Sequence, residues 1–533
     1  MSRNTLCSNS NRSRCLAIIF LFLIFGQIEG QRRSAEPQEE ITFQQVTERE
    51  YQKAFNELWP LGFRPESAKV QTIDGEVLFS LRMKKPKFPI DCQANHLLTD
   101  ARFSELDQKY KSQDYKLRIH ETFDWFGTRR HLAIWMRASK AQPLGQIWKF
   151  AKQVPASGKA RRRFRALDNL YKSFLFKNQI PGATVAVAYQ GKIIYERGFG
   201  YSELDDEIEM LPETRMRIAS ISKPITAAAI MRLVDQRKLS LSQPVFQTIL
   251  VPKDAPVDPR IQNITIDHLL RHRGGWDRGK SYDPMFIQQR IAKHFETKTP
   301  VGTDKIVEYM LAQPLDFTPG TKEVYSNFGY CVLGRVIEKI TKMNYETYVR
   351  NEILGPVGAN SMAIGGTLKS ELQSDETHYY SRTGRLANSV IEPGKSDQPR
   401  QYGGWHLESL DSHGGWISSA GDLVKFASAF DAPNDCPIMS ADAVKTMFIP
   451  FELTRLNRSK SYYAYGWRVV LIADGKANTF HSGKLTGTST MLVRRHDGYT
   501  WAFLFNCGSD LNGKTLSSKM DSLMHQAVNA VKN

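Results

Sequence analysis

The sequence predicts an α/β protein of the α+β type, with a large domain at residues 163–533 behind a small repeat domain at 41–145. Strand patterns lie at both ends of the large region and helical patterns fill its middle. We therefore expect one antiparallel sheet assembled from the two ends, flanked by helices, with an inserted helical subdomain. The region before it shows a helix–strand–strand pattern twice, and a chain of 533 residues is long enough for both units.

The repeat domain consists of two copies of one pattern. Residues 46–83 can be laid over residues 98–136 with one residue inserted, and in each copy a helical pattern precedes two strand-like runs. An Asp-Gly pair at 74–75 and a Phe-Gly pair at 126–127 supply the hairpin turns. Nucleophiles, bases and metal ligands do not cluster here, so we expect a packing or substrate-docking module. The polar segment 146–162, broken by proline and glycine, is the expected linker.

In the large domain, a helix leads to two strands joined by a tight turn, and three strands and a helix close the chain. The predicted elements are helix 163–176, strands 183–190 and 192–201, helix 225–234, strands 465–472, 489–496 and 499–506, and helix 517–531.

The first 30 residues predict a secretory signal peptide. Three arginines precede the apolar block CLAIIFLFLIFG (15–26), a polar stretch follows it, and cleavage is expected near Gly30. The block is too short to span a bilayer comfortably, although an uncleaved anchor is the alternative and a mitochondrial presequence a weaker one. We therefore expect an extracellular protein without a stable membrane anchor.

The chain is basic before and after this cleavage. Its net charge of +17 falls to +15, because three arginines and one glutamate leave with the signal peptide. Positive charge concentrates in RMKKPK (82–87) and GKARRRFR (158–165), which could attract acidic glycans, membranes or nucleic acid. We favour a solvated face or linker and expect no nucleic-acid partner, because no nucleic-acid-binding module accompanies the charge.

Four cysteines remain after cleavage: Cys92, Cys331, Cys436 and Cys507. In an oxidising compartment they can form two disulfides in three pairings, among which the sequence does not choose. Cys331 lies in a helical run and is alternatively a buried thiol. Glycosylation triplets at Asn263 and Asn457 suit an exported glycoprotein, although such triplets also arise by chance.

The stretch RIASISKPIT (217–226) combines a serine and a lysine at a helix start. Serine is a favoured N-cap, so Ser220 alone is explained by helix capping. A capping box, however, places Glu or Gln three residues later, whereas Lys223 faces the positive end of the helix dipole. Residues three apart share one helix face, so the amine can reach the hydroxyl and take its proton.

Two further motifs follow the Ser-x-x-Lys pair along the chain. Tyr325 and Asn327 lie where a loop enters a helix, and His481, Ser482 and Gly483 begin a C-terminal strand. With the Ser-x-x-Lys pair, this set resembles the serine β-lactamase and penicillin-binding protein superfamily. The branch it resembles most comprises class C β-lactamases and their relatives, which include D-Ala-D-Ala carboxypeptidases, D-aminopeptidases and family VIII esterases.

The resemblance covers roughly residues 160–533 and includes ITIDHLLRHRGGW (264–276) and HGGWISSAGDLVKFA (413–427). It implies a class C β-lactamase/DD-peptidase-like domain. The N-terminal repeats resemble those that precede such a domain in secreted polyglycine hydrolases, on the GFRP turn (62–65) and the LAIWM strand (132–136). This second resemblance favours a peptide substrate.

The family resemblance implies a role for each residue. Ser220 is the nucleophile, Lys223 and Tyr325 act as a coupled pair of bases, and Asn327 orients Lys223 or a substrate amide. The backbone N–H groups of Ser220 and Lys484 are the expected oxyanion hole. The resemblance implies that the protein uses neither a cofactor nor a metal. It also implies that the substrate is a small molecule or a peptide. It does not specify an oligomeric state.

His481 departs from the family pattern, because β-lactamases carry a lysine there. A permanent positive charge is therefore missing, and we expect hydrolysis but no efficient β-lactamase activity. His481, Ser482 and Gly483 are expected to support the substrate. We also expect Lys223 and His481 to favour the phenolate of Tyr325 or a shared proton, and strand alternation to point the Lys484 side chain away from the site.

Other histidines have simpler explanations. His268 and His272, four apart, could chelate a metal, but we expect a packed or exposed pair because a third ligand is lacking. His406 and His413 are expected in loops.

We thus expect a secreted serine hydrolase that forms an acyl-enzyme on Ser220 and cleaves an amide, peptide or ester bond. The alternatives are a catalytically idle relative that binds a peptide or another ligand, and an adhesion protein whose repeats carry the function. A complete Ser-Lys-Tyr set favours the enzyme.

Overall fold

A computed structural model describes residues 40–532 except for short segments at 60–61, 74, 86–89, 114, 139–152, 253, 255, 383–385, 393, 397, 451–460, 473–474 and 511–512. The chain divides into two compact units, residues 1–143 and 144–533. The predicted signal peptide, the first part of the predicted linker and the glycosylation triplet at Asn457 lie outside the described residues.

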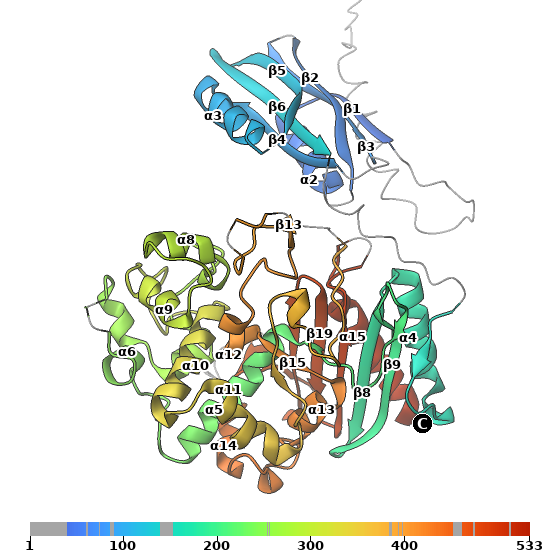
Figure 1. The fold of residues 1–533 in the computed structure, drawn as a ribbon, viewed down its shortest axis with the longest axis vertical. Helices are drawn as coiled ribbons and strands as arrows, with labels where there is room; N and C mark the ends of the chain where they lie inside the picture. Colours follow the sequence, from blue (N-terminus) through green and yellow to red (C-terminus); the bar gives the residue numbers. More distant parts are fainter. Residues whose placement is uncertain are drawn as a thin grey trace, which may run out of the picture. The chain divides into compact units, whose positions relative to one another are not determined.

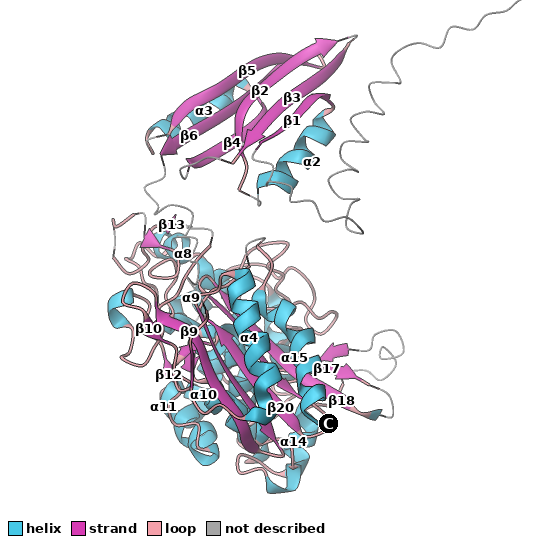
Figure 2. Cartoon of the chain, turned by 90° about the vertical axis from the view of Figure 1, so that its right-hand side faces the viewer, coloured by secondary structure: helices cyan, strands magenta, loops and turns pink. Residues whose placement is uncertain are grey.

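The N-terminal unit contains two copies of a strand–helix–strand–strand motif, each with its own three-stranded antiparallel sheet (Figures 1 and 2). The predicted motif lacked the first strand of each copy. Both are edge strands, in which small or polar residues such as Cys92 and His96 weaken the apolar alternation. The elements are β1 (Glu40–Val46), α2 (Glu48–Leu58), β2 (Arg64–Ile73), β3 (Glu76–Lys84), β4 (Ile90–Leu98), α3 (Asp100–Lys111), β5 (Lys116–Trp125) and β6 (Thr128–Ala138).

Helix α2 follows the predicted pattern closely. Thr47 caps it, and a reciprocal capping box joins Thr47 to Glu50. The helix buries Tyr51, Ala54 and Leu58, residues that recur on one helical face. The apolar spacing therefore places the core-facing side correctly.

The C-terminal unit is built on one large antiparallel sheet with strand order β10-β9-β8-β20-β19-β18-β17-β16, and β7 on β9. Its two ends meet where β8 pairs with β20, as the sequence predicts. Helices α4 and α15 cover one face (Figure 2). These elements are β7 (Ala156–Ser157), α4 (Arg165–Asn178), β8 (Gly182–Tyr189), β9 (Lys192–Glu203), β10 (Ile208–Glu209), β16 (Ser461–Tyr463), β17 (Arg468–Leu471), β18 (Ala477–Leu485), β19 (Thr488–Arg494), β20 (Tyr499–Phe505) and α15 (Leu516–Lys532).

A helical subdomain occupies the chain between β10 and β16 (Figure 1). Its helices are α5 (Ser222–Asp235), α6 (Val245–Thr248), α7 (Ile266–Leu270), α8 (Gln288–His294), α9 (Thr303–Leu311), α10 (Asn327–Thr341), α11 (Tyr345–Val349), α12 (Asp411–Gly414), α13 (Ala420–Ser428) and α14 (Ala441–Met447). Its short strands are β11 (Met216–Arg217), β12 (Ala363–Ile364), β13 (Leu386–Ala387), β14 (Gln398–Pro399) and β15 (Trp416–Ser418).

Two apolar layers hold this unit together. One lies between the sheet and helices α4 and α15, and the other fills the subdomain around α5, α10 and α13. Strand β8 lies between the layers and is buried at every position but its last. This arrangement confirms the predicted α+β fold.

Cysteines and helices bear on two further expectations. Cys331, Cys436 and Cys507 are free thiols, so two disulfides do not form among the four cysteines from Cys92 onward. Cys331 is the buried thiol within α10 that the sequence offered as the alternative. Among the described residues, no helix combines the length and the apolar character needed to cross a membrane.

Candidate active site

The proposed nucleophile lies on a single 3-10 turn, Ala219–Ile221, immediately before α5. Ser220 does not cap this helix, because Ile221 holds the N-cap position and makes no side-chain bond. Ala219 has φ of 50°, a left-handed conformation that is strained for a residue with a Cβ. Ser220 is half-buried between two buried neighbours, so its hydroxyl is accessible on a rigid turn.

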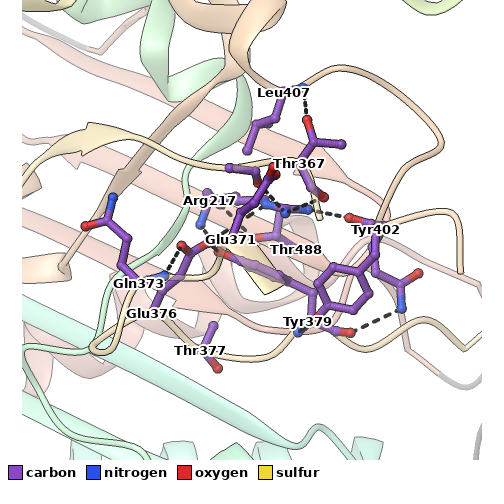
Figure 3. Close-up of polar contacts among 12 residues, drawn as sticks. Arg217, Thr367, Glu371, Gln373, Glu376, Thr377, Tyr379, Tyr402, Leu407 and Thr488 are labelled. Atoms are coloured by element: carbon purple, nitrogen blue, oxygen red, sulfur yellow. Dashed lines mark hydrogen bonds and ion pairs between the residues drawn. The ribbon is translucent and has the colours of Figure 1, made fainter. Parts of the chain in front are cut away.

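A buried arginine anchors the strand that leads into this turn (Figure 3). Arg217 is fully buried and donates to the carbonyl oxygens of Gln401, at 2.5 Å, and Gly366, at 2.8 Å. Its guanidinium lies 3.9 Å from the Glu376 carboxylate and 4.4 Å from the ring centroid of Tyr379. These contacts hold the backbone three residues ahead of Ser220.

Strands β18 and β19 hold the same turn from the other side. Thr488 and Thr490 donate to the carbonyl oxygens of Arg217 and Ile218, at 2.9 and 3.0 Å. A Cβ on Gly483 would lie 2.1 Å from the Ile218 oxygen, so only glycine allows this approach. The glycine of the His-x-Gly motif thus brings β18 next to the Ser220 turn.

Lys223 lies at the centre of the site and is fully buried. Its Nζ is 3.1 Å from Ser220 Oγ, 2.8 Å from Asn327 Oδ1 and 2.9 Å from the His413 carbonyl oxygen. The amide and carbonyl oxygens can only accept hydrogen bonds, whereas the hydroxyl can also donate. A neutral amine has two hydrogens and one lone pair, so it satisfies both acceptors and directs its lone pair at Ser220.

The surroundings favour this neutral amine. Burial lowers the pKa of Lys223 well below its usual value; Asp283 opposes the shift and the positive charge of Arg278 adds to it. The neutral amine can therefore act as a general base toward Ser220.

Tyr325 stands two residues before Asn327, the first residue of α10, and its phenol interacts with the Ser220 side chain. Burial raises the pKa of the Tyr325 phenol well above its usual value. A phenolate is therefore disfavoured, because desolvation outweighs the nearby positive charge of Arg278, whereas the shared proton stays a prediction. Tyr325 is a phenol at neutral pH and can donate or relay a proton.

His481 is buried and neutral. Burial, with a further contribution from Lys223, lowers the pKa of His481 to about 3. Its Nδ1–H donates to the Ser482 carbonyl oxygen at 2.8 Å, so its Nε2 accepts from the Tyr463 hydroxyl at 3.0 Å. His481 therefore supplies no positive charge to the site or to Tyr325.

Alternation along β18 separates its two faces. His481 and Gly483 are buried toward the site, whereas Ser482 and Lys484 are exposed, and the Lys484 amine donates to Thr515 Oγ1 at 2.8 Å. The predicted oxyanion donors, the N–H groups of Ser220 and Lys484, belong to the 3-10 turn and to β18, which pack against each other. In the described chain β17 pairs with β18 only over Ala477–Phe480, so the strand edge beyond it is open.

Sequence reasoning missed two residues in the loop between α7 and α8. The Asp283 carboxylate accepts from Asn327 Nδ2 at 2.7 Å, which turns the Asn327 oxygen toward Lys223. The Arg278 guanidinium lies 5.0 Å from the Tyr325 ring centroid and 3.7 Å from Asp283. An irregular loop has no periodicity or motif spacing that could have signalled either residue.

Comparison with known protein families agrees with this geometry. The Beta-lactamase family profile matches residues 167–515. The chain belongs to the β-lactamase family. The profile named "Polyglycine hydrolase-like, structural repeat" matches residues 42–85 and 90–138 and confirms the second resemblance.

Relatives of this β-lactamase-family protein include bacterial proteins. Penicillin-binding protein 4* of Bacillus subtilis is 27% identical over 334 residues, which cover 62% of this chain and 69% of that protein. Protein flp of Staphylococcus aureus is 27% identical over 364 residues, covering 68% and 66% respectively. The chain thus spans about two thirds of each relative.

Solved structures share the fold. A penicillin-binding protein homologue from Pyrococcus abyssi, described as octameric, superposes with a TM-score of 0.51 at 23% identity, covering 68% of this chain and 78% of that one. The D-amino acid amidase of Ochrobactrum anthropi gives 0.52 at 19% identity, covering 70% and 99%. Family membership supports a serine hydrolase in general.

His272 packs inside the β-lactamase-family site against two tyrosine rings. Its ring centroid lies 4.3 Å from that of Tyr325 and 4.4 Å from that of Tyr463, and its Nδ1 accepts from the Ser326 N–H at 3.2 Å. Burial lowers the pKa of His272 well below its usual value, so the ring is neutral. It is a packed support for Tyr325.

The remaining histidines have structural roles. His268 forms a capping box with Thr265 at the start of α7, and no metal-binding cluster occurs among the residues that the structure describes. His406 lies in a loop and contacts Ser409 Oγ at 2.5 Å. His413 lies in the short helix α12 and not in a loop, and its carbonyl holds Lys223.

Proposed function

We propose that this protein is an exported serine hydrolase that forms an acyl-enzyme on Ser220 and cleaves an amide, peptide or ester bond. The observation that carries the proposal is the environment of Lys223, whose two acceptor partners leave a lone pair for the Ser220 hydroxyl. A scaffold that only binds ligands has no need for a buried neutral amine beside a serine.

Acylation begins when the Ser220 Oγ attacks the substrate carbonyl carbon. The proton passes from Oγ to Lys223 Nζ as the new C–O bond forms, and the N–H groups of Ser220 and Lys484 bind the oxyanion. A single oxyanion donor contributes about 3–4 kcal/mol to lowering the barrier in hydrolases of this kind. Collapse of the intermediate breaks the scissile bond, and the proton reaches the leaving amine or alkoxide from Lys223 directly or through Tyr325.

Deacylation repeats these steps with water as the nucleophile. Lys223, with Tyr325, takes one proton from the water molecule as the water oxygen attacks the acyl carbon. The bond between the acyl carbon and Ser220 Oγ then breaks, and Oγ regains a proton from Lys223 or Tyr325. Asn327 keeps its oxygen on Lys223 throughout, because Asp283 holds its amide nitrogen. Lys223 and Tyr325 therefore act as one proton-transferring unit in both half-reactions.

Neutral His481 makes peptides or esters better substrates than β-lactam antibiotics. A β-lactam carboxylate finds no cation at this position of β18. The tandem repeats, which match the polyglycine hydrolase-like repeat, add support for a peptide. We expect a short ester or a glycine-rich peptide to be turned over faster than a chromogenic cephalosporin, and the reverse order would contradict this view of His481.

Intact-mass spectrometry after exposure to a fluorophosphonate tests the nucleophile. We expect one adduct on the wild-type protein and none on Ser220→Ala, with both proteins shown to be folded by circular dichroism. A wild-type protein that stays unmodified by fluorophosphonates and penicillins of several sizes would favour the idle alternative.

Export is a separate part of the proposal and rests on the apolar block at 15–26 with its preceding arginines. Expression of the full chain in a secreting eukaryotic cell, followed by N-terminal sequencing of protein from the medium, tests it. We expect a start close to Gln31. Retention of full-length protein inside the cell would contradict it.

A further inference from the structure

The Arg278 guanidinium lies at the edge of the active site. The Arg278 side chain is 50% exposed and lies 3.7 Å from the Asp283 carboxylate, beyond hydrogen-bond distance. Among the described residues no acceptor receives a hydrogen bond from its five N–H groups. Such a planar fork suits a carboxylate or phosphate in a two-point contact.

The charged side chains near Arg278 already have hydrogen-bond partners. The Asp283 oxygen nearest to Arg278 accepts from the Asn327 amide at 2.7 Å. In the same group of loops, Lys322 donates to the Asp277 carboxylate at 3.4 Å and Lys280 to a backbone carbonyl at 3.3 Å. Unlike both lysines, Arg278 therefore has guanidinium N–H groups available to bind a ligand.

Arg278 is also close to the reacting atoms. Its guanidinium lies 5.0 Å from the Tyr325 ring centroid, the Lys223 amine lies 4.7 Å from the same centroid, and the Tyr325 phenol interacts with the Ser220 side chain. One tyrosine side chain thus separates Arg278 from the nucleophile. A group bound to Arg278 would belong to the molecule being cleaved.

We propose that Arg278 binds an anionic group of the substrate, so that the preferred substrates carry a carboxylate a short chain away from the scissile carbonyl. The inference rests on the proposed hydrolase activity and narrows its substrate class. Neutral His481 provides no cation from β18, so the charge for such a substrate comes from the loop between α7 and α8.

Two matched pairs of esters test the proposal. In the first pair, the acyl chain ends in a methyl group in p-nitrophenyl butyrate and in a carboxylate in p-nitrophenyl monosuccinate. Phenyl butyrate and 4-carboxyphenyl butyrate place the difference on the leaving group. For wild-type protein we expect a higher kcat/KM for the anionic member of at least one pair, and the pair concerned identifies the end that Arg278 binds.

Arg278→Gln should lower that anionic-to-neutral ratio of kcat/KM at least tenfold, chiefly through a higher KM for the anionic ester. Arg278→Lys should recover part of the ratio, because it keeps the charge but loses the fork. Lys322→Gln is the matched control, since it removes one positive charge from the same loops and should leave the ratio unchanged. Rates are compared on the high-pH plateau, because Arg278 also affects the pKa of Lys223.

The outcomes separate the two proposals. An unchanged ratio in Arg278→Gln, or an equal fall in Lys322→Gln, overturns the assignment of Arg278 while hydrolysis stands. Wild-type protein that hydrolyses none of the four esters, and takes no fluorophosphonate on Ser220, overturns the proposed function and this inference together. Thermal melting of each variant shows that the compared proteins are folded.

Discussion

Two fully buried cationic side chains, Arg217 and Lys223, stand on either side of Ser220 in the sequence, and their surroundings differ. Arg217 faces the Glu376 carboxylate, backbone carbonyls and a tyrosine ring, so its charge is compensated. Lys223 has two neutral acceptors and a hydroxyl, and no carboxylate of the described residues contacts it directly, so burial favours its neutral form. A buried cation with a counter-charge supports structure, and one without it becomes a base.

The largest expected effect comes from removing the base. Lys223→Met should slow acylation of Ser220 about 10³-fold, because the hydroxyl loses its proton acceptor while a similar apolar volume is kept. Stopped-flow measurement of fluorophosphonate or ester acylation checks it. A loss below tenfold would assign the base role to Tyr325.

Removal of the compensated cation should affect stability first. Arg217→Met leaves the buried Glu376 carboxylate without its counter-charge, and we expect a loss of about 3–5 kcal/mol in the free energy of unfolding. Denaturant unfolding measures it. The double variant with Glu376→Gln should recover part of the loss, and an additive double variant would show that the two side chains do not interact.

The pH dependence distinguishes the two environments further. Because the pKa of Lys223 is lowered, acylation should rise with pH as the amine loses its proton and level off below the pKa of about 10.4 that a free lysine has. Removal of the Arg278 charge raises the pKa of Lys223, so Arg278→Gln should move the rise to higher pH. Movement toward lower pH would contradict the assigned electrostatics.

The lowered pKa of Lys223 also predicts how the free energy of unfolding changes with pH. Between the folded and unfolded pKa values of Lys223, the unfolded chain binds more protons, so stability should rise with pH across that window. Lys223→Met should flatten this part of the curve, whereas Arg217→Lys should not. Denaturant midpoints measured from neutral to alkaline pH provide the comparison.

The smallest expected effect concerns Tyr463. Tyr463→Phe removes the hydrogen bond to His481 Nε2 but keeps the ring that packs on His272. We expect a change of only a few-fold in kcat/KM and little change in stability, because a neutral hydrogen bond contributes about 1 kcal/mol. A loss as large as that of Lys223→Met would place Tyr463 in the proton-transfer pathway.

Sequence reasoning located the residues that motifs carry. Ser220 and Lys223 are three residues apart on one turn, and Tyr325, Asn327 and His481 were found as motifs in the family order. The structure brings all five into one site, although they come from three separate parts of the sequence. The pairing of the first and last strands of the large domain was likewise readable from the order of strand and helix patterns.

Protonation states and loop residues were not predictable in the same way. The phenol form of Tyr325 and the neutral form of His481 depend on burial, which residue spacing does not reveal. Asp283 and Arg278 reach the site from an irregular loop, and the backbone carbonyl of His413 contributes an atom that every residue has. The two missed edge strands of the repeat unit lack a strong apolar alternation.

The pairing of β8 with β20 has a consequence for synthesis of the protein. These strands lie side by side in the middle of the large sheet, yet β8 ends at Tyr189 and β20 begins only at Tyr499. The sheet can therefore close only after β20 has left the ribosome, long after β8, and a chain cut short before Tyr499 would lack the strand that joins its two halves. Such a product leaves β8 with an open, apolar edge, a feature that quality-control chaperones and proteases recognise.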